Sequence, residues 1–196
     1  MNEISSVKVH VQALLNISDH ITRILARYND PAKPFIFGLM LGVKTSNEDG
    51  SQLVEVKHSI ELAVREPGKQ RDVNYDGSAQ RVPEVDCTFF RDRQLQMRQV
   101  HPDCAPVGIY ITTDKQEVDH VDRAIYSALK SSGLDSPDLI MLHVSYSFAK
   151  ERRKARSRGA EQLPVSAYQI LTASDGDTDP KSTFRRIEFS TAMDEV

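Results

Sequence analysis

The sequence has few of the residues that stabilise or anchor special classes of protein. Its 196 residues include no tryptophan and only two cysteines, Cys87 and Cys104, too few for a disulfide framework and without the Cys-x-x-Cys spacing of a structural zinc site. Residues 1–8 do not have the pattern of a signal peptide. The longest apolar run, Pro34 to Val43, has about half the length of a membrane-spanning helix. We therefore expect a protein of a reducing compartment that is neither secreted nor membrane-spanning.

The sequence also lacks the short motifs that mark common catalytic centres. No histidine stands within four residues of another, so the His-x-His and His-x-x-x-His pairs of zinc enzymes are absent. Gly-x-Ser-x-Gly does not occur, and neither cysteine has a recognisable catalytic setting. Gly38 and Gly42 lie inside an apolar run and not in a phosphate-binding loop. These patterns predict no cofactor, although a site assembled from distant residues stays open at this point.

The composition is that of an ordinary folded domain. Hydrophobic residues make up 39% and charged residues 27%, which indicates a soluble chain with enough apolar surface for one core. Apolar periodicity predicts a single mixed α and β domain over residues 1–196. Helices are expected over 11–28, 91–101 and 117–130, and strands over 7–9, 35–44, 53–60, 85–90, 106–112, 139–144, 165–171 and 184–189.

Two polar segments interrupt this pattern. Residues 65–84 have few apolar side chains, and we expect a long flexible insertion there. Residues 149–162 form a basic loop that suits either a site for an anion or partner, or a solvated loop. Phe148 is the only aromatic residue near it, so no specific nucleic-acid binding is expected. The basic side chains are Lys150, Arg152, Arg153, Lys154, Arg156 and Arg158.

Several segments, taken in order, resemble one family. Val7-Lys8-Val9-His10 leads into a helix containing Leu15 to His20, the strand Ile36 to Gly42 follows, and Leu53 to Val56 and Val107 to Tyr110 complete the set. Their order and spacing resemble an MPN domain, the fold shared by subunits of the proteasome lid, the COP9 signalosome and translation initiation factor 3. The resemblance spans nearly the whole chain and departs at the two polar segments. It implies a curved, mostly antiparallel sheet flanked by helices, like that of cytidine deaminases.

The resemblance also bears on catalysis. Catalytic members of the family bind zinc through a His-x-His pair and an aspartate, with a glutamate as general base. Position by position, the resemblance places Ile111 and Thr113 at the two histidines and Phe35 near the glutamate, and leaves Asp122 as the one acidic match. Isoleucine and phenylalanine have no lone pair to offer, and a threonine hydroxyl is a poor zinc ligand. The resemblance therefore implies a domain that is not an enzyme and holds no metal or cofactor.

A non-catalytic MPN domain is expected to pair with a catalytic one. The chain most resembles the non-catalytic signalosome member, whose partner, subunit 5, removes a ubiquitin-like modifier from cullins in the cytoplasm and nucleus. In such pairs the first helix and the helix after the degenerate metal loop form the contact. The candidate residues, each equally well explained by core packing, are Val11, Leu14, Leu15, Ser18, Val121, Ala124 and Ala128.

Several alternatives stay open. Within the family, the chain could be a non-catalytic subunit of the proteasome lid or of initiation factor 3. From other classes, it could be an isopeptidase with a rebuilt site or a nucleic-acid binder acting through the basic loop. Pairing of the isolated domain with itself is not excluded either. We also expect the native chain to continue beyond Val196 into helices that dock in a multisubunit bundle.

Overall fold

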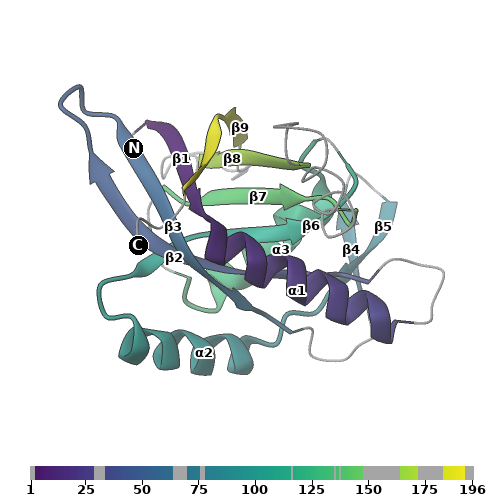
Figure 1. Ribbon diagram of the computed structural model, residues 1–196. Coiled ribbons are helices and arrows are strands. Elements are labelled where there is room, and N and C mark those ends of the chain that lie inside the picture. The colour runs from purple at the N-terminus through teal and green to yellow at the C-terminus, as the bar shows by residue number, and fades with distance from the viewer. Residues whose placement is uncertain are drawn as a thin grey trace.

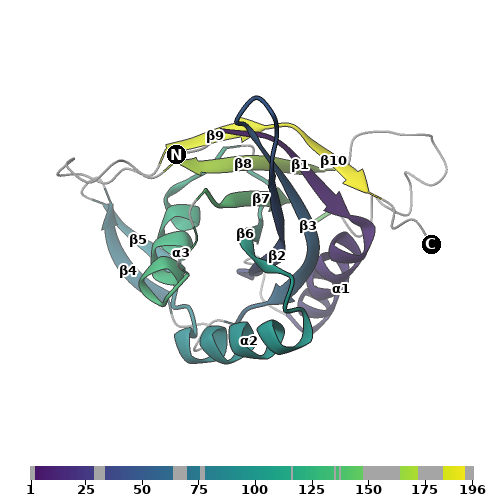
Figure 2. The same cartoon turned by 90° about the vertical axis from the view of Figure 1, so that its left-hand side faces the viewer.

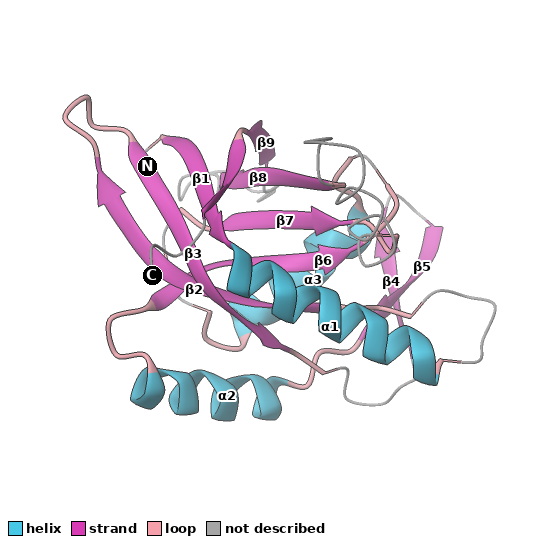
Figure 3. Ribbon diagram, in the orientation of Figure 1, coloured by secondary structure: helices cyan, strands magenta, loops and turns pink. Residues whose placement is uncertain are grey.

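The computed structural model is a mixed α and β domain built on a curved sheet (Figure 1, Figure 3). It describes residues 3–28, 34–63, 70–75, 78–115, 117–134, 136, 138–147, 164–171 and 183–192, with only the backbone described over 70–75, 78–82 and 183. The elements in chain order are β1 (Ile4–His10), α1 (Val11–Arg27), β2 (Phe37–Ser46), β3 (Gln52–Glu61), β4 (Gln70–Tyr75), β5 (Ser78–Pro83), α2 (Cys87–Val100), β6 (Ala105–Thr112), α3 (His120–Ser131), β7 (Ile140–Val144), β8 (Val165–Leu171), β9 (Thr183–Ile187) and β10 (Phe189–Ala192).

Eight of these strands form one sheet in the order β10-β1-β3-β2-β6-β7-β8-β9. The pairs β10–β1, β1–β3 and β6–β7 are parallel, and the other four are antiparallel. Only Glu188 separates β9 from β10, yet the two strands pair with opposite edges of the sheet. The sheet must therefore curl until its edges meet (Figure 2). The expected curved, mostly antiparallel sheet flanked by helices is confirmed.

Buried hydrogen bonds join the two edges of the sheet. Gln169 on β8 is fully buried, and its Oε1 accepts hydrogen bonds from the backbone N–H of Ile4 at 3.3 Å and from Nη2 of Arg185 at 2.6 Å. The same Nη2 lies 3.3 Å from the backbone oxygen of Ile4, and Arg185 also pairs with Glu3. Strands β1, β8 and β9 are thus tied at one point, and a buried amide is stable there because its oxygen is satisfied twice.

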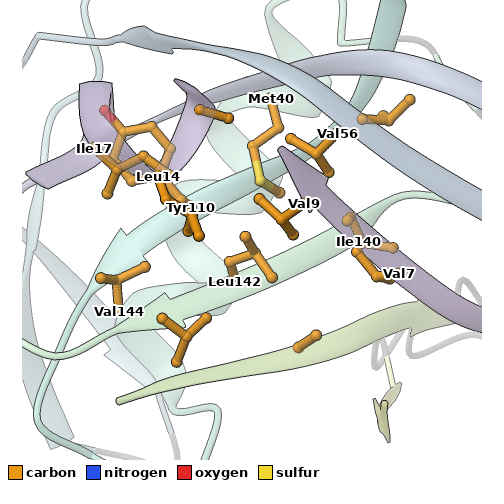
Figure 4. Packing of buried hydrophobic residues seen from close by; sticks show 14 of the residues in the cluster. Val7, Val9, Leu14, Ile17, Met40, Val56, Tyr110, Ile140, Leu142 and Val144 are labelled. Atoms are coloured by element: carbon orange, nitrogen blue, oxygen red, sulfur yellow. The ribbon is translucent and has the colours of Figure 1, made fainter. Parts of the chain in front are cut away.

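The sheet separates two apolar clusters because successive side chains of a strand point to opposite faces. On β7, Ile140 and Leu142 join the cluster beneath α1, whereas Met141 joins the cluster beneath α2 and α3. Figure 4 shows the first cluster, in which Leu14 and Ile17 of α1 lie beside Tyr110 of β6. The uninterrupted apolar run of β2 is explained by this arrangement, since the strand is covered on both faces.

Two of the expected strands are corrected. Residues 85–90 were expected as a strand, but α2 already begins at Cys87. The cause is Asp86, whose side chain accepts hydrogen bonds from the backbone N–H groups of Thr88 at 3.1 Å and Phe89 at 3.0 Å and so caps the helix. Residues 184–189, expected as one strand, divide between β9 and β10.

Within the polar segment over 65–84, the described residues form two strands in place of the expected insertion without regular structure. Strands β4 and β5 pair antiparallel as a separate two-stranded sheet, with Val73 opposite Gln80. Asp76 and Gly77 lie outside the described residues. The flexibility of this segment stays a prediction.

A buried hydrogen bond connects α1 to the middle of the sheet. Nδ1 of His20 lies 2.7 Å from the hydroxyl of Tyr110, and Nε2 lies 3.9 Å from the carboxylate of Glu61, which also pairs with Arg23. Burial lowers the pKa of His20, although the charge of Glu61 acts in the opposite direction. Burial also disfavours the charged form of Tyr110 and so raises its pKa. The fold therefore favours a neutral imidazole beneath α1.

This histidine should make the stability of the domain depend on pH. Because the pKa of His20 is lower in the folded state than the ordinary value of 6.5, protons bind more strongly to the unfolded chain as the pH falls below 6.5. Urea unfolding should thus show lower stability at about pH 5.5 than at about pH 7.5. The loss should be smaller in His20→Asn, and an identical loss in both proteins would contradict the assignment.

Gly38 on β2 makes room for the same hydrogen bond. A Cβ atom at this position would overlap both the Tyr110 ring and the backbone oxygen of Ile60. We expect Gly38→Ala to destabilise the domain by about 2 kcal/mol or more, since neither a backbone carbonyl nor a packed ring can move freely. Thr45→Ala, at an exposed position of the same strand, is the control. Equal unfolding midpoints for the two variants would show that the ring has space to shift.

Candidate functional site

Two positions matched to catalytic residues are filled by apolar side chains on one face of the sheet. Ile111 is buried near the end of β6 and belongs to the cluster beneath α2 and α3. Phe35 precedes β2 and packs, partly buried, against the same cluster. The register of β2 and β6 places Phe37 opposite Ile111, so the start of β2 and the end of β6 lie together. The structure thus places Ile111 and Phe35 at the same apolar cluster.

Thr113 makes hydrogen bonds to nearby backbone groups. Its backbone N–H donates to the oxygen of Val144 at 2.9 Å, and its Oγ1 accepts from the backbone N–H of Lys115 at 3.1 Å. The hydroxyl therefore shapes the loop between β6 and α3, as a threonine in a turn commonly does.

Asp122 lies in the first turn of α3, where two carboxylates form a capping box. Asp119 accepts hydrogen bonds from the N–H groups of Val121 at 2.8 Å and Asp122 at 3.2 Å, and Oδ2 of Asp122 accepts from the N–H of Asp119 at 2.8 Å. Burial acts to raise the pKa of Asp119, but its hydrogen bonds, foremost from Lys115, leave that pKa lowered. The cap explains why the helix begins at His120 and fixes the Asp122 side chain.

His143 is the residue at this site that sequence reasoning missed. It is buried on β7, directly opposite Ile111 in the parallel β6–β7 register, and its ring lies tilted against Tyr168 with centroids 5.0 Å apart. Its Nε2 lies 3.2 Å from Oδ2 of Asp122. The one available signal was a histidine inside an otherwise apolar strand, which by itself gives no partner.

The side chains at this centre do not fit a zinc ion. Zinc in proteins takes three or four nitrogen, sulfur or oxygen ligands from the chain. Asp122 and His143 offer two, and the neighbouring Ile111 offers none. Across the described ranges, no group of three or more histidine, cysteine, aspartate or glutamate side chains is placed to hold a metal.

Three other histidines, His10, His58 and His101, also have neighbours that the sequence does not reveal. The rings of His58 and His101 stack with centroids 3.8 Å apart. Nε2 of His10 lies 2.8 Å from Oε1 of Glu55, and this hydrogen bond is the main cause of the lowered pKa of Glu55.

The candidate partner-binding residues differ in exposure. Leu14 is 5% exposed and lies in the cluster beneath α1 (Figure 4), and Ser18 is also buried, so on α1 the structure favours the core-packing interpretation for these two. Val11 is 37% exposed and Leu15 is half-buried. On α3, the three candidate residues are half-buried: Val121, Ala124 and Ala128. Partner contact stays a prediction for all of these residues.

The two candidate surfaces lie apart. Helix α1 covers one face of the sheet and α3 covers the other, as Figure 2 shows. A partner that uses both helices must therefore make two separate contacts. The six basic side chains between Lys150 and Arg158 lie outside the described residues. In the part of the chain that is described, no helix is long and apolar enough to cross a membrane.

Comparison of the whole sequence with known proteins finds distant relatives. No family model matches it. The COP9 signalosome complex subunit 6a of Arabidopsis thaliana is 25% identical over 182 residues, which cover 83% of this chain and 47% of that protein. Subunit 6b of the same plant is 24% identical with the same coverage, and subunit 6 of Drosophila melanogaster is 23% identical over 116 residues, 59% of this chain and 28% of that protein.

The chain thus spans about half the length of the two plant relatives and less of the fly protein. The similarity extends over most of the chain and agrees with the curved sheet and its flanking helices. The chain is therefore similar to COP9 signalosome subunit 6, and its fold is that of an MPN domain.

Proposed function

We propose that this domain is a non-catalytic scaffold of a COP9 signalosome, which pairs with the catalytic MPN subunit, subunit 5, and supports removal of a ubiquitin-like modifier from cullins. The observation that carries the proposal is the similarity to signalosome subunit 6 over 83% of the chain. Other signalosome subunits are the further partners that this role requires. The role also places the protein in the cytoplasm and nucleus.

The side chains of the former reaction centre support the non-catalytic part of the proposal. Hydrolysis at a metal centre needs a bound water of lowered pKa and a group that takes its proton. Ile111 and Phe35 can do neither, and both are packed into an apolar cluster. The region that would activate water in an enzyme here contributes to the core of the domain.

The exposed apolar side chains of α1 support the pairing part. Val11 and Leu15 lie one turn apart, and neither is covered completely by the domain itself. Side chains at i and i+4 share one face of a helix, so together they offer an apolar contact to another helix. On α3, the small residues Ala124 and Ala128 have the same spacing and allow close approach.

Pairing should respond to charge on the α1 surface. We expect Leu15→Asp to weaken binding to the catalytic MPN subunit by at least about tenfold, because an unpaired carboxylate would be buried at the contact. Asn16→Asp adds the same charge at the next, exposed position and should change binding little. Biolayer interferometry with the purified partner measures both variants. Equal affinities would remove α1 from the interface, and Val121→Asp then tests α3 in the same way.

Histidines at the two matched positions should not by themselves give cleavage activity. We expect Ile111→His combined with Thr113→His to give no cleavage of a cullin–modifier conjugate, since Phe35 still cannot accept a proton. Gel-based cleavage with added zinc tests this, and the catalytic subunit is the positive control. Zinc-dependent cleavage by the double variant would show that the general base is supplied from elsewhere.

A further inference from the structure

Two buried ionisable side chains meet between α3 and the sheet. Asp122 is 3% exposed and His143 is 4% exposed, and they lie on α3 and on β7, the strand that follows α3 in the chain. Nε2 of His143 and Oδ2 of Asp122 are 3.2 Å apart, within ion-pair distance. A contact between two such groups is specific, because each would be costly to bury alone.

The residues around Asp122 and His143 show that this pair connects α3 to the sheet. Oδ2 of Asp122 also accepts from the backbone N–H of Asp119, so the same oxygen belongs to the capping box of α3. His143 lies in β7, in register with Ile111 of β6 and against the ring of Tyr168 of β8. The first turn of α3 is therefore linked to three adjacent strands through one imidazole ring.

The imidazole leaves hydrogen-bonding capacity unused. Neither ring nitrogen of His143 makes a directed hydrogen bond to a described residue, so the contact with Asp122 is its main polar interaction. A leucine would fill this apolar position without leaving an unsatisfied nitrogen. A histidine that served packing alone would thus be poorly suited to its surroundings.

We propose that Asp122 and His143 form a positioning pair, which fixes the N-terminal turn of α3 on the sheet through side chains alone. The resemblance places a metal ligand of catalytic family members at Asp122, and here the carboxylate turns to a histidine of the neighbouring strand. The pair holds the helix that carries Val121, Ala124 and Ala128 in one orientation. That consequence for a partner rests on the proposed function, whereas the pair itself does not.

Hydrogen–deuterium exchange on the purified 196-residue chain tests the pair without any partner. In His143→Leu, Asp122 remains buried without its partner, and we expect amide exchange in the first two turns of α3 to rise by at least about tenfold. In His143→Gln, an amide N–H can still reach the carboxylate, so protection should be largely retained. The amides of β2 and β3 are the internal control and should not change in either variant.

A role in packing alone predicts the opposite order, since leucine is the more apolar of the two replacements. Better protection of α3 in His143→Leu than in His143→Gln would overturn the proposal, as would equal exchange in both. If His143→Leu does not fold, Asp122→Asn supplies the second comparison. It keeps the oxygen that caps Asp119 and removes the charge, so α3 should again lose protection while the strands do not.

Discussion

Closure of the curved sheet is the constraint on which the rest of the domain depends. Strands β9 and β10 follow one another in the chain yet pair with β8 and β1 at opposite edges. Gln169 binds both Ile4 and Arg185 at the point where the edges meet. The two faces of the curled sheet bury one cluster beneath α1 and another beneath α2 and α3. Both polar junctions of the helices, His20–Tyr110 and Asp122–His143, form across these two faces.

The same closure explains how the domain can keep its shape with apolar side chains at the positions matched to catalytic residues. The strands around Ile111 are held by backbone pairing and by the apolar cluster, and neither requires a metal. The first turn of α3 is held by its capping box and by His143. A fold stabilised in this way tolerates loss of catalytic side chains, because fold and reaction depend on different residues. Under the proposed function, the domain acts by presenting surfaces to partners.

The sequence predicted much of this fold because its strongest signals are local. The apolar period of α1 and the uninterrupted run of β2 gave the correct elements, and the order of segments pointed to the MPN fold. The strand expected over 85–90 was wrong because Asp86 caps a helix there, and two adjacent phenylalanines suit either structure. His143 could not be assigned, since its partner lies 21 positions earlier and only the packing of α3 on β7 brings the two side chains together. Periodicity placed Leu14 on the apolar face of its helix but could not show that the domain itself buries this side chain, so its contact with a partner stays a prediction.

Under the proposed function, this domain holds a catalytic neighbour and has no hydrolytic centre of its own. The most direct measurement is the zinc content of the purified complex between this chain and a catalytic MPN subunit, determined by mass spectrometry under native conditions. We expect one zinc ion per heterodimer, retained by the catalytic subunit after the two chains are separated. Two ions per heterodimer, with one remaining on this chain, or failure of the two chains to form a complex at all, would contradict it.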